Sequence, residues 1–355
     1  MPRERADAFA PGRVNLIGEH TDYNGGLALP FAIDEGITVR AQARPPDPDG
    51  VVRVRADALD LGESDEFELA EPQPVAGWRA FVRGAIAELT RAGHELVGAS
   101  LQISGELPRG AGLSSSAALE VALCVALLEL GSSARSWELG DFDRLEIARL
   151  CSRVENDWVG AHTGLLDQLA SIFGVDRCAL CIDFATLQIQ PVPLELDGWR
   201  LFLLDSGERH TNASSGYNER RAECTRACEL LGVQSISQAP AEEIERLPEP
   251  LRLRARHVQG ENERVLSAVA ALRAGQLAGL GTLISLSHAS CRDLFAMSTP
   301  ALDRAVEEML IAGAAGARMM GGGFGGSVLG LFAPGKTPPA GAREVRPGPG
   351  AHLLA

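Results

Sequence analysis

The chain has 355 residues, which leaves room for about two domains of roughly 100–200 residues each. Asp and Glu total 47 against 33 Lys and Arg, so the net charge is -14. An acidic chain does not offer the basic surface that attracts nucleic acid or anionic membranes, and we expect neither as a partner. The first residues do not form the apolar core of a signal peptide and no apolar run approaches membrane-spanning length, so we expect a cytoplasmic protein.

A single lysine, Lys336, stands in the whole chain, within a segment rich in proline and glycine. The P-loop of nucleoside triphosphatases and the active site of protein kinases both need a lysine beside the phosphates. Neither kind of site is therefore expected here. Any phosphate chemistry of this chain must depend on backbone amides, arginine and a metal ion.

The first part of the chain predicts strands that precede helices. Residues 27–44 are rich in apolar and β-branched residues but are interrupted at 34–36, which predicts a hairpin, and 51–70 predicts a more polar one. Apolar residues at helical spacing predict a helix over 78–91, and 97–103 returns to strand. Two further helices are expected, one almost wholly apolar and therefore buried, the other amphipathic: residues 114–130 and 142–158.

A second compositional unit begins near residue 190 with a predicted strand, WRLFLLDSG. Helical patterns then fall at about 217–231, 252–273 and 299–316, and MMGGGFGGSVLGLF predicts a glycine turn that enters a strand. The stretch from Ala333 onward is rich in Pro and Gly, and we expect it to be loosely ordered. Strands and helices do not alternate regularly, so the pattern favours an α+β fold over a Rossmann sheet, with domains at 1–190 and 191–355.

The segment GRVNLIGEHTDYNGG, residues 12–26, crowds polar and charged side chains into one strand and turn. They are Arg13, Asn15, Glu19, His20 and Asp22. A packed core has no use for such a set, whereas ionised acceptors make strong hydrogen bonds to hydroxyl groups. The segment therefore predicts a loop that binds a polyhydroxylated ligand.

A phosphate site is predicted at PRGAGLSSSAALE, residues 108–120. Glycines 110 and 112 let the backbone approach a ligand closely, and the helix that follows presents unpaired N–H groups and the positive end of its dipole. Three serines, 114 to 116, add hydroxyl groups, one of which could bind Mg2+. Serine also caps helices, but one cap needs one serine, so three favour phosphate binding.

Two more carboxylates and a glycine turn complete the candidate chemistry. Glu155 lies on the amphipathic helix, and Asp167 opens a short helix, where an ordinary N-cap is the competing interpretation. The turn MMGGGFGGS, residues 319–327, has more glycines than a routine turn needs. Close approach of its backbone to a ligand or to the phosphate loop explains them better.

Together these motifs resemble the GHMP small-molecule kinases and, within them, the galactokinase family. The stretch PRGAGLSSSAA is similar to the phosphate loop of the superfamily, GGGFGG is similar to its C-terminal glycine motif, and GRVNLIGEHTDY matches the galactokinase signature at every fixed position. The resemblance implies a two-domain α+β fold with the active site in the cleft between the domains. It also implies a monomer that uses ATP and Mg2+ to phosphorylate the anomeric hydroxyl of galactose.

Roles carried over from the resemblance fall into three groups. Arg13 and Asp167 would flank the hydroxyl that is phosphorylated, as the catalytic pair. The other sugar contacts would be Glu19, His20, Asp22, Gly164, Asp183 and Tyr217. The nucleotide contacts would be Trp78, Phe81, Gly110, Ala111, Gly112, Leu113, Ser114, Ser115 and Ser116. Ser115 and Glu155 correspond to ligands of Mg2+. The resemblance is compatible with Asp167 either abstracting the proton or orienting the hydroxyl.

Departures from the family pattern keep other hypotheses open. Gly25 stands where the family usually has a larger polar residue, Thr163 where cysteine is common, and Phe81 where tyrosine is usual. A wider pocket would suit a related sugar such as N-acetylgalactosamine, arabinose or galacturonate. A non-catalytic sensor of galactose and ATP is the other alternative. Such regulators lack a Ser-Ala pair in the phosphate loop, and here SSSAA is intact.

Overall fold

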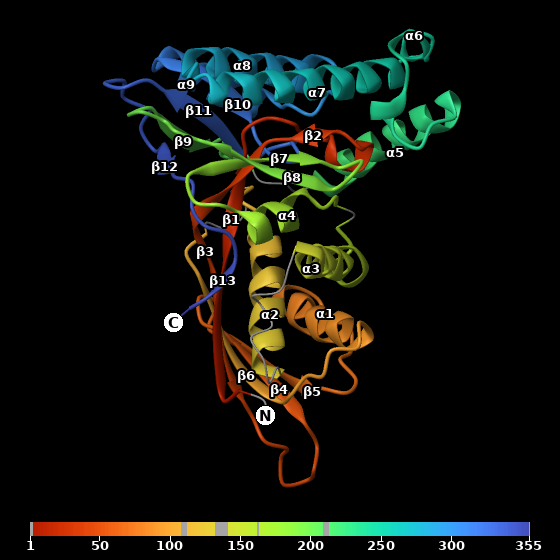
Figure 1. Cartoon of the computed structure of the whole chain (residues 1–355), viewed down its shortest axis with the longest axis vertical. Coiled ribbons are helices and arrows are strands. Elements are labelled where there is room, and N and C mark those ends of the chain that lie inside the picture. The colour runs from red at the N-terminus through yellow and green to blue at the C-terminus, as the bar shows by residue number, and fades with distance from the viewer. Residues whose placement is uncertain (1–2, 108–111, 132–140, 162, 209–212, 355) are drawn as a thin grey trace.

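The computed structural model describes residues 3–107, 112–131, 141–161, 163–208 and 213–354. The molecule is elongated in Figure 1: long strands with helices beside them make up one end, and a layer of helices over further strands makes up the other. Within these described ranges the sheets contain six, four and three strands. The architecture is α+β, as the sequence predicts, since the strands pair antiparallel except for one parallel pair.

The six-stranded sheet forms the long end of the molecule. Its strands, in spatial order, are β13 (His352–Leu353), β1 (Arg5–Asn15), β3 (Pro30–Ala43), β6 (Ala99–Gly105), β4 (Arg53–Ala58) and β5 (Glu63–Glu68). The helices beside it are α1 (Trp78–Arg91), α2 (Ser115–Gly131) and α3 (Asp141–Arg153). Helix α2 is buried along most of its length, as its apolar sequence predicts, because it runs between the sheet and the other helices (Figure 1).

The predicted hairpin over residues 27–44 is wrong, although the hairpin over 51–70 is confirmed by the β4 and β5 pairing. Strand β3 runs through the interruption without turning, and a separate two-residue strand, β2 (Leu27–Ala28), precedes it. The acidic residues fit within the strand because Asp34 is exposed and Glu35 pairs with Arg343. Gly36 is needed for close strand approach, since a Cβ there would lie 2.2 Å from the Ala10 carbonyl.

The other end of the molecule holds two smaller sheets. The four-stranded sheet has the order β10 (Ala314–Met319), β11 (Ser327–Phe332), β9 (Arg200–Asp205), β12 (Arg343–Val345). The three-stranded sheet contains β2, β7 (Cys178–Asp183) and β8 (Gln188–Pro193). In Figure 1 helices lie in a layer over the four-stranded sheet: α7 (Leu251–Arg273), α8 (Leu277–Asp293) and α9 (Pro300–Ile311). Beside them are α5 (Ala213–Leu231), η3 (Ile236–Gln238) and α6 (Ala241–Ile244).

Several elements of this end were not predicted, among them α8 and β10. Helix α8 was missed, because its sequence mixes glycine and serine, which are weak helix formers, with the leucines that bury it. The predicted helix over 299–316 ends at Ile311, and β10 follows it. Helix α3 likewise ends at Arg153, where a π-helical turn, η2 (Val154–Val159), replaces the rest of the predicted helix.

The expectation of a loosely ordered tail after Ala333 is wrong. Strand β12 pairs with β9, and β13 returns to the other end of the molecule to pair with β1. The tail is held because its few strand residues complete the edges of two sheets. Within the part of the chain that the structure describes, no helix has the length and apolar character needed to cross a membrane.

Candidate functional site

The segment between β1 and β2, residues 16–26, folds back on itself as the sugar loop. The Gly18 carbonyl accepts hydrogen bonds from Asn15 Nδ2 at 3.2 Å and from Thr21 Oγ1 at 2.9 Å. Three residues of this loop have positive φ, Gly18 with 99°, His20 with 58° and Gly25 with 62°. A residue other than glycine in that region is strained, and such strain persists only where the surroundings hold it.

The sugar loop forms part of a cavity of about 160 Å³. The residues that line it come from both ends of the chain: Arg13, Glu19, His20, Asp22, Thr163, Gly164, Leu166, Asp167, Tyr217, Gly321 and Gly322. A cavity of this size with so many polar groups suits one small hydroxylated molecule. We call it the sugar cavity.

Asp167 lies where the sugar cavity meets the start of α2. It belongs to α4 (Leu166–Phe173), whose N-cap is Leu165, so the helix-cap interpretation of Asp167 is wrong. One carboxylate oxygen accepts a hydrogen bond from Arg13 Nε at 2.8 Å, and the other accepts one from the Ser114 hydroxyl. Both oxygens are thus held in place by charge and hydrogen bonding.

Asp22 packs directly against Gly164 in the wall of the sugar cavity. A Cβ at Gly164 would lie 1.8 Å from Asp22 Oδ2, so only glycine leaves room for this carboxylate. Burial, reinforced by the nearby charge of Asp167, raises the pKa of Asp22 to about 6. The carboxylate is consequently ionised near neutral pH and protonated in mild acid.

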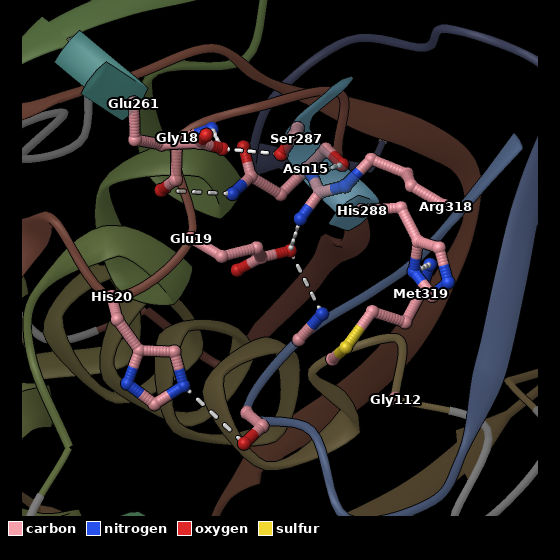
Figure 2. Close-up of polar contacts among 12 residues, drawn as sticks. Asn15, Gly18, Glu19, His20, Gly112, Glu261, Ser287, His288, Arg318 and Met319 are labelled. Atoms are coloured by element: carbon pink, nitrogen blue, oxygen red, sulfur yellow. Dashed lines mark hydrogen bonds and ion pairs between the residues drawn. The ribbon is translucent and has the colours of Figure 1, made fainter. Parts of the chain in front are cut away.

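His20 is buried among aromatic rings. Its Nδ1 lies 2.5 Å from the Tyr23 hydroxyl. Its Nε2 lies 3.3 Å from the Gly322 carbonyl, a contact drawn as a dashed line in Figure 2. The Tyr217 ring is 4.9 Å away, centroid to centroid. Burial, with a smaller contribution from His257, lowers the pKa of His20 to about 3, so the imidazole is neutral at physiological pH.

Glu19 is held by the glycine turn and by a buried arginine. Its Oε1 accepts a hydrogen bond from the Gly321 amide at 2.8 Å and forms an ion pair with Arg318 Nη2 at 3.0 Å (Figure 2). The glycine turn, residues 320–326, therefore contacts the sugar loop through its backbone, whereas the excess of glycines predicted approach to a ligand or to the phosphate loop. Gly321 and Gly322 also line the sugar cavity.

Glu155 lies on the π-helical turn η2 and is 5% exposed. Its carboxylate accepts hydrogen bonds from Ser116 Oγ at 2.9 Å, Thr163 Oγ1 at 2.7 Å and Gln168 Nε2 at 2.9 Å. Burial, and then the charge of Asp167, raises the pKa of Glu155, while these hydrogen bonds lower it. Hydroxyl and carboxylate oxygens are the donors that Mg2+ takes in proteins, so the set fits that ion.

A second, larger cavity of about 760 Å³ opens beside the start of α2. Trp78, Phe81, Ser115 and Ser116 line it, and we call it the nucleotide cavity. Its aromatic and hydroxyl lining at a helix N-terminus fits a nucleotide with phosphates. Among the described residues, no cluster of three or more His, Cys, Asp and Glu forms a separate metal site.

Some of the predicted phosphate-loop residues lie outside the described part of the chain, and others contact Arg13. Gly110 and Ala111 lie outside the described residues. The Gly112 carbonyl accepts a hydrogen bond from Arg13 Nη1 at 2.6 Å, and the Leu113 carbonyl accepts one from the Arg13 amide at 3.2 Å. Arg13 thus joins the phosphate loop to Asp167.

One predicted sugar contact lies elsewhere, and several residues beside the site were missed. Asp183 is not among the described lining of the sugar cavity, because its carboxylate accepts a hydrogen bond from the Ala185 amide at 2.8 Å in the turn after β7. Arg318, Glu261 and Gln168 were not predicted. The only sequence signal for Arg318 is its place just before the glycine turn.

Family models match most of the chain. Residues 3–43 match the galactokinase galactose-binding signature. Residues 80–175 match the GHMP kinases N terminal domain, and residues 268–348 match the GHMP kinases C terminal model. The first match contains the sugar loop and the third contains the glycine turn.

Individual proteins are similar over nearly the whole length. The chain is 43% identical over 328 residues to a galactokinase of Mycobacterium tuberculosis, covering 91% of this chain and 87% of that protein. It is 41% identical over 331 residues to a galactokinase of Streptomyces coelicolor, covering 90% and 82%. The crystal structure of Lactococcus lactis galactokinase complexed with galactose matches with a TM-score of 0.89 at 34% identity, covering 99% of this chain and 96% of that one. An L. major mevalonate kinase matches at TM-score 0.66 and 19% identity, covering 98% of this chain and 99% of that one, which is a likeness of fold alone.

Proposed function

Because this chain belongs to the galactokinase family of the GHMP kinases, it is an ATP-dependent sugar kinase, and we propose the residues with which it acts on galactose. The reaction transfers the γ-phosphoryl group of ATP to the anomeric hydroxyl of α-D-galactose and yields galactose 1-phosphate and ADP. Phosphoryl transfer depends on positioning and on neutralising charge rather than on covalent chemistry. We therefore assign each residue a role according to the part of the sugar, the nucleotide or the metal ion that it can bind or orient.

Galactose is held in the sugar cavity by acceptors that are already oriented. Asp22 and Glu19 accept hydrogen bonds from sugar hydroxyls, and His20 contributes the face of a neutral imidazole ring to the wall. Tyr217 closes one wall beside the His20 ring, and Gly164 leaves room for the Asp22 carboxylate. An epimer with a displaced hydroxyl would leave one of these buried groups unpaired, which gives strong discrimination.

The observation that carries the proposal is the Arg13–Asp167 ion pair, 2.8 Å long, between the sugar cavity and the phosphate loop. Asp167 lines the sugar cavity and can accept a hydrogen bond from the hydroxyl that attacks. Arg13 places a positive charge beside the position of the transferred group. Ser114, which donates to the second oxygen of Asp167, keeps that carboxylate turned toward the cavity.

Ser115 and Glu155 would hold the magnesium ion, with Ser116 as a neighbour that orients Glu155. When bound, Mg2+ neutralises charge on the phosphate oxygens. Trp78 and Phe81 offer apolar surface to the base, and the amides at the start of α2 face the phosphates. The chain's own contribution is thus to orient the nucleotide with its γ-phosphate toward Asp167.

The departures at Gly25 and Thr163 do not widen the sugar cavity. A Cβ at Gly25 would lie 2.8 Å from Ser235 Oγ, and Gly25 is not part of the described cavity lining. Thr163 lines the cavity, but its hydroxyl donates to Glu155 on the metal side. A larger sugar therefore gains no space from either residue, which favours galactose over the related substrates.

We also infer that the enzyme acts as a monomer in the cytoplasm. ATP is supplied in the cytoplasm. Sedimentation of the purified protein at working concentration tests the monomer directly, and a stable dimer would contradict it.

The experiment that tests the proposed function is a panel of free sugars incubated with ATP, with and without Mg2+. We expect ADP and a sugar 1-phosphate to form from galactose in the presence of Mg2+, and neither to form after chelation of the metal. The 31P resonance of the product identifies the anomeric position. A clear preference for another sugar, or full turnover without a divalent ion, would contradict the proposal.

A further inference from the structure

One face of α7 follows the backbone of the sugar loop. His257 Nε2 lies 3.1 Å from the Glu19 carbonyl, and Glu261 Oε1 accepts a hydrogen bond from the Gly18 amide at 2.9 Å. His257 and Glu261 are four residues apart and so share a face of the helix. The second half of the chain thus contacts backbone groups of a loop that belongs to the first half.

Arg318 on β10 approaches the same loop from the other side. Its side chain is 0% exposed, forms the ion pair with Glu19 at 3.0 Å, and donates from Nη1 to the Asn15 carbonyl at 3.2 Å. Figure 2 shows its guanidinium between Asn15 and Glu19. A buried carboxylate such as that of Glu19 is costly unless it is paired, and Arg318 supplies that pairing inside the protein.

Glu261 is also completely buried and fully engaged. Besides the Gly18 amide, it accepts a hydrogen bond from Ser287 Oγ of α8 at 2.5 Å, and its other oxygen pairs with Arg264 at 2.7 Å. Burial alone raises the pKa of a carboxyl group, yet the surrounding cations and Ser287 hold the pKa of Glu261 down at about 2. Glu261 is therefore a fixed anion that holds the Gly18 amide.

These contacts converge on Glu19 and on the Gly18 amide just before it, next to the strained backbone of His20. Gly18 and His20 both have positive φ, and Glu19 lies between them. Glu261 fixes the backbone before Glu19, Arg318 fixes its side chain, and the Gly321 amide holds the same carboxylate from the glycine turn. Neither Glu261 nor Arg318 is among the described residues that line the sugar cavity.

We propose that Glu261 and Arg318 are positioning residues that set the sugar loop for galactose recognition. The inference rests on the proposed function, since it deepens the account of the same sugar cavity. When a loop already has its binding conformation, no binding free energy is lost to ordering the loop as the sugar binds. Loss of either residue should therefore weaken the binding of galactose, while leaving the nucleotide cavity, which lies on the first sheet and α2, unaffected.

The test compares Arg318→Met, Arg318→Lys and Glu261→Gln with the parent by calorimetric titration of galactose and of ADP. We expect the Met and Gln variants to bind galactose about 10- to 100-fold more weakly, because one partner of a buried charged contact is left unpaired. Arg318→Lys should bind galactose more tightly than Arg318→Met, since lysine keeps the positive charge but lacks the several N–H donors of the planar guanidinium. ADP affinity should stay at the parent value, and KM for galactose should rise more than kcat falls.

Two further variants keep the test decisive. Glu129→Gln alters a carboxylate that is 2% exposed and paired with Arg3 at the far end of α2, so it should lower the melting temperature without changing galactose affinity. Ser287→Ala removes only one hydrogen bond to Glu261 and should weaken galactose binding by about two- to fivefold.

The outcomes separate the proposed function from the positioning role. A parent enzyme that does not phosphorylate galactose contradicts the function, and the titrations are then made with the sugar that it does accept. Folded Arg318→Met and Glu261→Gln proteins that bind the sugar as tightly as the parent would overturn the positioning role. If neither of these two variants folds, a Ser287→Ala protein that binds the sugar as tightly as the parent would overturn the positioning role.

Discussion

The sugar cavity and the nucleotide cavity are built in opposite ways. The sugar cavity is small, about 160 Å³, and its lining combines residues from Arg13 to Gly322. The nucleotide cavity is about 760 Å³, and its described lining runs only from Ile37 to Leu119, within the first sheet and the helices beside it. One cavity therefore depends on how both halves of the chain meet, and the other depends on one half.

The difference matches what each ligand requires. An epimer of galactose differs by the direction of one hydroxyl, so it can be rejected only by buried polar groups in fixed positions. A nucleotide is held by its phosphates and by a flat base, which a helix N-terminus and aromatic rings can hold. Changes in the second half of the chain should therefore alter sugar binding first, and the predictions below test that division.

The largest effect is expected for Asp167→Asn, because Asp167 lies between the sugar cavity and the nucleotide cavity. The amide keeps the shape but cannot accept a proton or balance Arg13, so kcat should fall about 10^2- to 10^4-fold while galactose still binds. A coupled assay of ADP release with a parallel galactose titration measures both. Asp176→Asn, an exposed position just beyond α4, is the matched control. Near-parental kcat in Asp167→Asn would reduce Asp167 to a structural residue.

A smaller effect, on the Mg2+ dependence of the rate, is expected for the residues assigned to the metal ion. Ser115→Ala and Glu155→Ala should raise the Mg2+ concentration for half-maximal rate about 10- to 100-fold, and Ser116→Ala should raise it less, because Ser116 only orients Glu155. Mg2+ titrations at fixed ATP, together with galactose binding measured without metal, separate the two cavities. Equal losses for Ser115→Ala and Ser116→Ala would show that the two hydroxyls do not have distinct roles.

The affinity for galactose should depend on pH through Asp22. Because its pKa is raised to about 6, the carboxylate is ionised above that pH and gains a proton below it. A protonated acid is a poorer acceptor, so galactose affinity should be constant above pH 6 and fall up to about tenfold per pH unit below it. His20, with a pKa of about 3, does not titrate in this window. Calorimetry without metal should show the transition in the parent and not in Asp22→Asn.

The smallest effect is expected for Thr163→Val. This change removes the hydroxyl that donates to Glu155 at 2.7 Å but keeps the shape of the wall, so the apparent Mg2+ affinity should fall only about fivefold. The ratio of kcat/KM for galactose to that for N-acetylgalactosamine should not change. A variant that gains activity on the larger sugar would place Thr163 among the residues that select the substrate.

The sequence predicts local features of the site better than distant ones. The sugar loop could be found because its charged residues lie within a few positions of each other, and α1 and the start of α2 because their patterns are strong. Glu261 could not be found, since it contacts Gly18 across 243 residues of chain and carries no motif of its own.

The errors in the fold have the same origin. Tertiary pairing overrode the local signal at Asp34 and Glu35, where a strand continues through residues typical of turns. It also ordered the Pro- and Gly-rich tail by pairing its short strands with β9 and β1. For Asp183 the error came from the resemblance, which assigned it to the sugar site, while the structure has it at the end of β7 with its carboxylate bonded to the Ala185 amide.

The measurement that tests the central claim most directly is kcat/KM for galactose against glucose, with Mg·ATP at saturation. The account predicts a ratio of about 10^4 or more, because the wrong epimer leaves a buried acceptor of the sugar cavity unpaired. The ratio should shrink in Arg318→Met, where the sugar loop loses its support, and should persist in Glu129→Gln. Comparable kcat/KM values for the two sugars in the parent enzyme would contradict the account.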